Sequence, residues 1–143
     1  MNSDGLSDDA IRTLLGGIRR IALIGASNKP ARPSNGVMRF LLDHGYQVVP
    51  VNPLLAGQEI HGRKVVASLA EAGPVDMVDV FREARAAPEI ARQAVAAGAR
   101  ALWLQLGVVN AEAGRIAREG GLAFVEDRCP AIEIPRLGIA AVA

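Results

Sequence analysis

The stretch IALIGASNKPARPSNGVMRFLLDHGYQVVPVNP, which runs from Ile21 to Pro53, decides the fold. Its apolar start predicts a strand over Ile21–Gly25, and its middle predicts a helix over Ser34–His44 that Gly45 closes. A second strand is expected over Tyr46–Val51. Two strands joined by a crossover helix form a βαβ unit, so these strands are predicted to lie parallel in one sheet.

The rest of the chain repeats this alternation. Further strands are expected over Val75–Phe81, Ala101–Leu106 and Leu122–Glu126, and further helices over Glu83–Ala97 and from a cap at Asn110 to Arg118. Strands that alternate with helices through right-handed crossovers give an α/β fold. We expect a doubly wound parallel sheet of about five strands with helices on both faces.

The segments outside this alternation are short. Ser7 is expected to cap a first helix, and Ser68 to Glu71 have the spacing of a capping box for a short helix. Residues 53–63 show no periodicity and are predicted to be a loop, while residues 127–143 show no clear period. We expect one domain over residues 1–143, with an N-terminal helix in residues 1–17 and the C-terminal tail packed on it.

Composition narrows the class of protein. Half of the 143 residues are hydrophobic but only 3% are aromatic, so the core must be built from Ala, Val, Leu and Ile, as in parallel strands covered by helices. The formal net charge of +1 gives no broad field for nucleic acid, and the one cysteine cannot form an internal disulfide. No apolar run approaches the roughly 20 residues that span a membrane. We expect a cytoplasmic protein that binds neither nucleic acid nor membrane.

Ligands of doubly wound sheets bind outside the carboxyl ends of the strands. This rule selects four loops, namely residues 26–33 and the segments that begin at Asn52, Arg82 and Gln105. Each of the four loops carries polar side chains. The loops are expected to converge at one edge of the sheet and to form a binding site there.

The loop over residues 26–33 has the features of a phosphate site. Gly25 permits a tight turn, and Ser34 is expected to cap the helix that follows. Unpaired N–H groups at a helix N-terminus attract phosphate, and Lys29 and Arg32 add two cations. A glycine-rich turn is a weak signal by itself, so an ordinary strand-to-helix turn with solubilising cations remains the alternative.

The end of the second strand argues against NAD. Dinucleotide-binding domains usually place Asp or Glu there for the ribose hydroxyls, whereas this strand ends in Val51-Asn52-Pro53. NADP would instead need a cation, and Leu54 supplies none. No separate substrate domain is expected in so short a chain. An NAD(P)-binding oxidoreductase or redox sensor therefore stays as the alternative function.

Other reaction types have little support in the sequence. His44 and His61 lack the partners of a metal site, so no metal is predicted. Asp76 and Asp79 lie three apart on a strand and face opposite sides of the sheet, so they cannot act as a pair. No P-loop motif is present.

Cys129 follows Arg128, and a cation beside a cysteine favours its reactive thiolate form. A catalytic cysteine also needs a base, and neither histidine can be placed near it from the sequence. A structural or ligand-lining role is favoured over catalysis. Arg128 is expected to pair with Asp127, Glu133 or a ligand phosphate.

Several ordered motifs together resemble one family. They are Gly25-Ala26-Ser27, Arg32-Pro33-Ser34, Val51-Asn52-Pro53, Val78-Asp79-Val80-Phe81-Arg82, Trp103-Leu104-Gln105-Leu106-Gly107 and Asp127-Arg128-Cys129-Pro130. The chain resembles, from about Ile18 to Leu137, the small stand-alone CoA-binding proteins. Their Rossmann-like domain is related to the CoA-binding domain of the succinyl-CoA synthetase alpha subunit.

The resemblance implies a Rossmann-like five-stranded parallel sheet with coenzyme A, or an acyl-CoA, lying across its carboxyl edge. By position it assigns the ligand contacts to Gly25, Ala26, Ser27, Asn28, Lys29, Arg32, Ser34, Asn52, Pro53, Phe81, Arg82 and Gln105. The nucleotide-grasping domain and the phosphorylated histidine of the larger synthetases are not found in this chain. The resemblance therefore implies binding of a CoA-type small molecule without catalysis, with CoA-thiol chemistry at Cys129 as an alternative. It names no protein partner.

Overall fold

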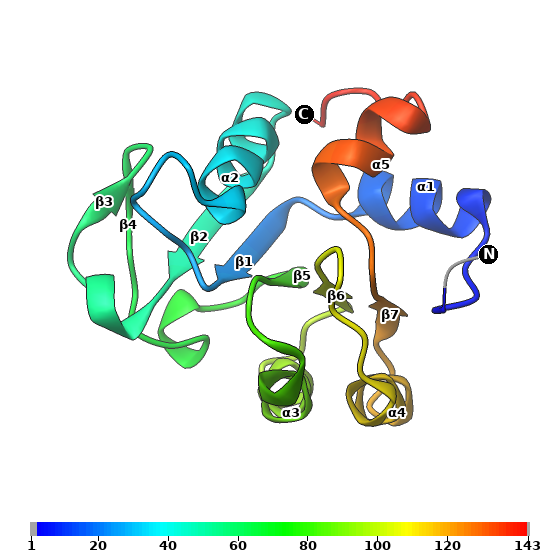
Figure 1. Cartoon of the computed structure of the whole chain (residues 1–143). Helices are drawn as coiled ribbons and strands as arrows, with labels where there is room; N and C mark the ends of the chain where they lie inside the picture. The colour runs from blue at the N-terminus through cyan, green and yellow to red at the C-terminus, as the bar shows by residue number, and fades with distance from the viewer. Residues whose placement is uncertain (1–2, 143) are drawn as a thin grey trace.

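A computed structural model describes residues 3–142 and contains a five-stranded parallel sheet (Figure 1). The strand order is β2-β1-β5-β6-β7, so the chain reverses direction across the sheet between β1 and β5. The strands are β1 (Arg20–Ile24), β2 (Gln47–Val51), β5 (Met77–Val80), β6 (Ala101–Leu104) and β7 (Ala123–Val125). The predicted α/β fold is confirmed.

Helices cover both faces of the sheet (Figure 1). One face carries α1 (Asp8–Gly17), α2 (Pro33–Asp43) and α5 (Pro130–Arg136), and the other carries α3 (Ala87–Ala96) and α4 (Ala111–Glu119). Neighbouring strand residues alternate between two buried cores, because successive side chains point to opposite faces. Leu23 and Trp103 lie in the α1–α2–α5 core, whereas Ala22 and Leu102 lie in the α3–α4 core.

The predicted caps of two helices are confirmed, and a third is wrong. The Ser7 hydroxyl accepts a hydrogen bond from the Ala10 N–H at 3.1 Å, and Asn110 Oδ1 accepts from the Ala113 N–H at 2.8 Å. Helix α2, in contrast, starts at Pro33, and its N-cap Arg32 makes no side-chain cap bond. Proline suits the first helical position, because its φ is fixed near the helical value and it has no N–H that would need a partner there. The helix therefore begins before Ser34, and Ser34 is buried inside it.

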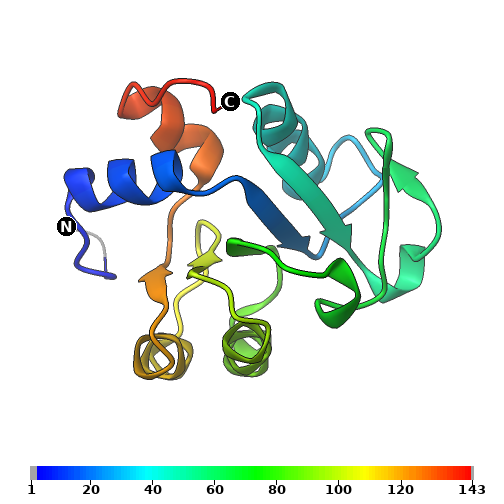
Figure 2. The ribbon, with the colours of Figure 1, turned by 180° about the vertical axis from the view of Figure 1, so that it is seen from behind.

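The segment 53–63, predicted to be a loop, contains regular structure. It starts with a 3-10 turn, η1 (Pro53–Leu55), and continues into a hairpin of β3 (Glu59–Ile60) and β4 (Arg63–Lys64). Both residues of the hairpin turn have positive φ, 48° at His61 and 78° at Gly62, as two-residue hairpin turns require. Figure 2 shows the hairpin beside β2. Strands of two residues are too short to show an alternating pattern, so the sequence did not reveal them.

Two further segments differ in detail from the sequence prediction. The capping box at Ser68 precedes a 3-10 turn, η2 (Ala70–Ala72), and a second 3-10 turn, η3 (Ala84–Ala86), precedes α3. In the tail, α5 forms although it contains Pro135, and it packs against both α1 and α2. Within residues 3–142, no helix has the length and apolar character that a membrane crossing needs.

Candidate functional site at the carboxyl edge of the sheet

A cavity of about 560 Å³ opens over the carboxyl ends of β1, β2, β5 and β6. Of the twelve residues assigned to the ligand from the sequence, all except Pro53 line it. Pro33, Leu54, Leu55 and Val108 line it as well and were not predicted. The four predicted loops thus converge at one place, because the carboxyl ends of parallel strands meet at the same edge.

Gly25 makes the turn out of β1 possible. Its φ is +86°, and a Cβ atom there would lie 2.4 Å from the carbonyl oxygen of Phe81. Both conditions exclude a larger side chain. The carbonyl oxygen of Val51 accepts hydrogen bonds from the N–H groups of Gly25 and Ala26, at 3.0 and 3.2 Å. The start of the loop is therefore fixed to the end of β2.

Asparagine side chains hold the rest of the loop over residues 26–33. Asn52 Nδ2 donates to the carbonyl oxygen of Ala26 at 2.8 Å, and Asn35 Nδ2 donates to that of Ser27 at 2.9 Å. The Ser27 hydroxyl accepts from the N–H of Lys29 at 3.1 Å. The loop is therefore preorganised by the protein itself, and Asn35, inside α2, is a supporting residue that the sequence pattern did not single out.

The β3–β4 hairpin supports the same loop from outside. His61 Nε2 lies 3.0 Å from the carbonyl oxygen of Asn35 and 3.1 Å from its Oδ1. Asn28 Nδ2 donates to Gln58 Oε1 at 3.4 Å. Because the hairpin was predicted to be a loop, neither contact could be anticipated.

The cations at the cavity differ in their partners. Lys29 and Arg32 are exposed, and no ion pair within residues 3–142 includes either of them. Arg82 forms an ion pair with Glu83, with a nitrogen–oxygen distance of 3.3 Å. Lys29 and Arg32 are therefore the cations that an anionic ligand meets uncompensated.

A second cavity, of about 660 Å³, lies at the same sheet edge toward α3. It shares Gly25, Asn52, Leu54 and Arg82 with the first cavity, so the two are adjacent. Pro53, the predicted residue absent from the first cavity, lines this one together with Ile90 of α3. The edge of the sheet thus offers a surface long enough for an extended ligand.

The two aspartates of the third predicted strand do not form a pair. Asp76 precedes β5 and accepts hydrogen bonds from the N–H groups of Arg19 and Arg20, at 2.9 and 3.0 Å. Asp79 lies within β5 and is fully buried, and neither of its carboxyl oxygens has a partner among the described residues. Burial raises the pKa of Asp79 to about 8.

Arg128 lies outside this site. It is 4% exposed and binds Asp4 with two nitrogens, each at 2.9 Å, and Glu133 with a third at 2.9 Å. The pairing with Glu133 was among the predicted alternatives, whereas Asp4 is 124 residues away in sequence and was missed. These bonds occupy the guanidinium, so the alternative of a ligand phosphate at Arg128 is wrong.

Cys129 belongs to the core on the α1–α2–α5 face and is 5% exposed. Trp103 Nε1 donates to the carbonyl oxygen of the preceding Arg128 at 2.8 Å, which fixes the backbone at this point. Residues 3–142 contain no group of three His, Cys, Asp or Glu side chains that is arranged to hold a metal ion.

The sheet order, the glycine turn and the cavity at the carboxyl edge define a Rossmann-like α/β domain. The family model of the CoA binding domain matches residues 19–135. The chain therefore belongs to the CoA-binding domain family, as its motifs indicated.

The chain is also similar to known proteins in sequence and in structure. The chain is 38% identical over 120 residues to the uncharacterized protein YneT of Bacillus subtilis (strain 168), and the match covers 83% of this chain and 87% of YneT. A hypothetical protein of Pyrococcus horikoshii OT3 has a TM-score of 0.90 at 41% identity, with 96% of each chain covered. The protein ID.343 of Thermus thermophilus has a TM-score of 0.87 at 38% identity, with 92% of this chain and 99% of that one covered.

Proposed function

We propose that the protein binds coenzyme A or an acyl-CoA along the carboxyl edge of its sheet and catalyses no reaction of its own. The observation that carries this proposal is the cavity that gathers the predicted ligand residues around the loop over residues 26–33. Membership of the CoA-binding domain family supports the ligand class.

In this proposal the phosphates of the ligand bind at the start of α2. This helix has eleven residues, and its first turn presents backbone N–H groups together with the positive end of the helix dipole. Gly36 is exposed in this turn, and a Cβ added there would meet nothing within 4 Å. The open backbone allows a phosphate to approach closely, and Lys29 and Arg32 supply positive charge beside it.

The remaining parts of the ligand need an extended, partly apolar surface. Leu54, Leu55, Phe81 and Val108 supply apolar side chains in the first cavity, and Ile90 supplies one in the second. Leu54 is 88% exposed, so covering it with a ligand removes apolar surface from water. A long molecule with a polyanionic segment, such as coenzyme A, suits both cavities together.

The Lys29→Ala, Arg32→Ala double variant is expected to weaken CoA binding by about 1–3 kcal/mol, because both cations lose charge-assisted bonds to phosphate. Isothermal titration calorimetry measures this difference. The matched control is the Arg63→Ala, Lys64→Ala double variant, which removes the same charge from β4, outside the first cavity. Equal affinities of the two double variants would show that the phosphates bind elsewhere.

The function itself is tested by titrating the purified protein with CoA, acetyl-CoA and NAD. We expect both CoA species to bind more tightly than NAD, since β2 ends without an acidic residue. If NAD or NADPH bound more tightly than CoA, the NAD(P)-binding alternative would be favoured. Absence of CoA binding at millimolar concentration would contradict the proposed function. Mass spectrometry of the ligand that copurifies with the protein identifies the acyl group.

A further inference from the structure

Asp79 is an acidic residue in the middle of the parallel sheet. Its neighbours in register are Leu23 on β1 and Trp103 on β6, both fully buried. These residues belong to the α1–α2–α5 core, so the Asp79 carboxyl group lies on the side of the sheet that faces α2 and α5. Within residues 3–142 no group donates a hydrogen bond to either of its oxygens.

The side-chain oxygen of Gln105 is in the same situation as the carboxyl oxygens of Asp79. Gln105 follows β6, its N–H donates to the carbonyl oxygen of Val80 at 3.3 Å, and the residue lines the 560 Å³ cavity. The residue is 9% exposed, and its Oε1 is buried without a partner among the described residues. Gln105 lies two residues beyond Trp103, so it is the diagonal neighbour of Asp79 on the same face, within reach of a long side chain.

One proton on Asp79 can pair two of these three buried oxygens. A buried carboxylate beside an amide oxygen leaves several acceptors without a donor, which is costly in a dry core. A protonated carboxyl group has an O–H that can donate to the amide oxygen. With a pKa raised to about 8, Asp79 holds this proton at neutral pH.

Among residues 3–142, no charged group contributes to the pKa of Asp79. Burial is the one cause that shifts its pKa. The titratable side chains described in the α1–α2–α5 core are Cys129 and Tyr46, and the Tyr46 hydroxyl donates to the carbonyl oxygen of Leu15. On α5, Glu133 is paired with Arg128 and Arg136.

We propose that Asp79 is a positioning residue whose protonated carboxyl group donates a hydrogen bond to Gln105 Oε1, and that this bond turns the Gln105 amide N–H groups toward the cavity. There they donate to an acceptor oxygen of the ligand, either a carbonyl oxygen of its pantetheine arm or a phosphoryl oxygen. The bond to the ligand rests on the proposed function, whereas the bond between Asp79 and Gln105 does not.

The bond is tested first without ligand, by NMR. The carboxyl carbon of Asp79 and the side-chain amide of Gln105 are expected to shift together, with one midpoint near pH 8. In the Asp79→Asn variant the Gln105 transition should disappear. A carboxyl group that titrates in the ordinary range near 3.8, or a Gln105 resonance that does not follow Asp79, would overturn the proposal.

The second test measures ligand binding. The Asp79→Leu variant, which offers no donor, should weaken acetyl-CoA binding roughly three- to tenfold, the scale of one neutral hydrogen bond. Asp79→Asn keeps an N–H donor and should bind like the wild-type protein. Wild-type affinity should fall as pH rises through about 8, whereas that of Asp79→Asn should not. Equal affinity of the Leu variant and wild type would overturn the proposal.

ADP serves as the probe that separates the two sources of the acceptor oxygen. If Asp79→Leu weakens acetyl-CoA binding but not ADP binding, the acceptor lies in the pantetheine arm, and if both weaken equally, it is a phosphoryl oxygen. Either result supports the proposal. If the wild-type protein binds no CoA while the NMR transitions stay coupled, the proposed function fails and the Asp79–Gln105 bond stands.

Discussion

Replacing Arg128 with methionine is expected to lower the free energy of unfolding by about 3–5 kcal/mol, the cost of breaking a buried ion pair by removing one partner. Arg128 and its partners Asp4 and Glu133 are all less than 8% exposed. Methionine fills a similar volume, so the loss comes from the carboxylates left behind and not from a void. Urea unfolding at pH 7 measures the difference.

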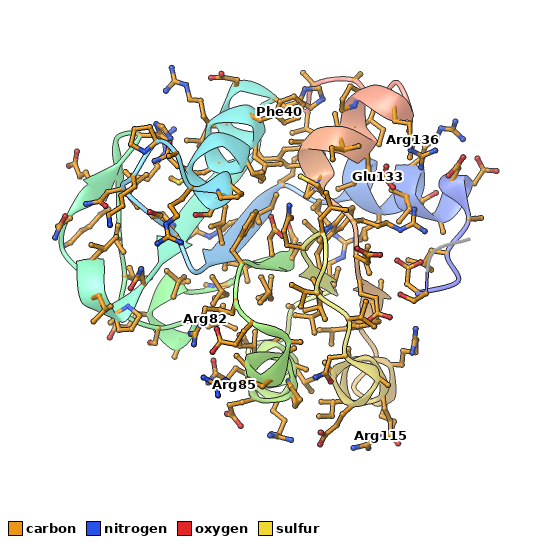
Figure 3. All side chains as sticks on the ribbon, viewed as in Figure 1. Phe40, Arg82, Arg85, Arg115, Glu133 and Arg136 are labelled. Atoms are coloured by element: carbon orange, nitrogen blue, oxygen red, sulfur yellow. The ribbon has the colours of Figure 1, made fainter. Side chains whose placement is uncertain are left out.

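The geometry shows which carboxylate loses its compensating charge in the Arg128→Met variant. Asp4 accepts two of the three Arg128 bonds to carboxylates, and its other donors are the N–H groups of Leu6 and Glu126. Glu133 keeps a second cation, because Arg136 Nε lies 2.8 Å from its Oε2. Glu133 and Arg136 both project from α5 toward α1 (Figure 3). The uncompensated charge in the variant is therefore that of Asp4.

The acid dependence of this effect follows from the two carboxyl groups. Burial raises the pKa of Asp4 and of Glu133. At Asp4 the hydrogen bonds from Arg128 and from the N–H groups of Leu6 and Glu126 outweigh it, and at Glu133 those from Arg136 and Arg128 do, so both pKa values lie below their ordinary 3.8 and 4.5. Their stabilisation is present above those ordinary values and is lost as pH falls through the folded-state values. The deficit of the variant should therefore shrink in acid.

The matched control is Arg136→Met. Arg136 is half-exposed, and its removal leaves Glu133 bound to Arg128, so we expect a loss of at most about 1 kcal/mol. An Arg128→Met variant no less stable than Arg136→Met would show that the buried cluster contributes nothing to stability.

Replacing Asp79 with asparagine is expected to stabilise the protein by about 4 kcal/mol at pH 7, through removal of the cost of protonating a buried acid. The pKa of Asp79 is about 8 in the folded protein against an ordinary 3.8, because burial disfavours the charged form. At pH 7 the wild-type chain must take up a proton to fold, and asparagine needs none.

The pH dependence fixes the sign of this prediction. Between about pH 4 and pH 8 the folded protein holds a proton on Asp79 that the unfolded chain has released, so wild-type stability falls as pH rises across this window. Above it both states are ionised and the loss is complete. The advantage of Asp79→Asn should therefore grow from pH 4 to pH 8 and then level off, as urea midpoints over pH 4–9 would record.

Asp76→Asn is the control of opposite sign. Burial raises the pKa of Asp76, but hydrogen bonds from the backbone of Arg20 and Arg19 outweigh it and lower the pKa below its ordinary value. Neutralising Asp76 therefore removes a favourable charge and should destabilise the protein at pH 7.

Parallel stability curves of wild type and Asp79→Asn from pH 5 to pH 8 would contradict the assigned protonation of Asp79.

The strands and the loops at their carboxyl ends could be predicted because their signals are local. Apolar runs closed by glycine marked β1 and its crossover helix, and polar residues after the strands, such as Asn52 and Gln105, marked the loops. The start of α2 was misplaced by one residue, since Pro33 overrides Ser34 at the helix start. The hairpin at His61 was missed because strands of two residues have no period.

By itself, the sequence determined the α/β fold, the edge of the sheet where the candidate site lies and most of the residues that line its cavity. The fold and the sheet edge follow from periodicity and from the rule that ligands of doubly wound sheets bind at the carboxyl ends of the strands. The individual lining residues were implied by the resemblance to the CoA-binding proteins. Only the tertiary structure decided which polar groups are free and which are occupied. It left Lys29 and Arg32 exposed, bound Arg128 to Asp4 and buried Asp79 away from every hydrogen-bond donor among residues 3–142. Partners far apart in sequence and the exclusion of water are set by packing.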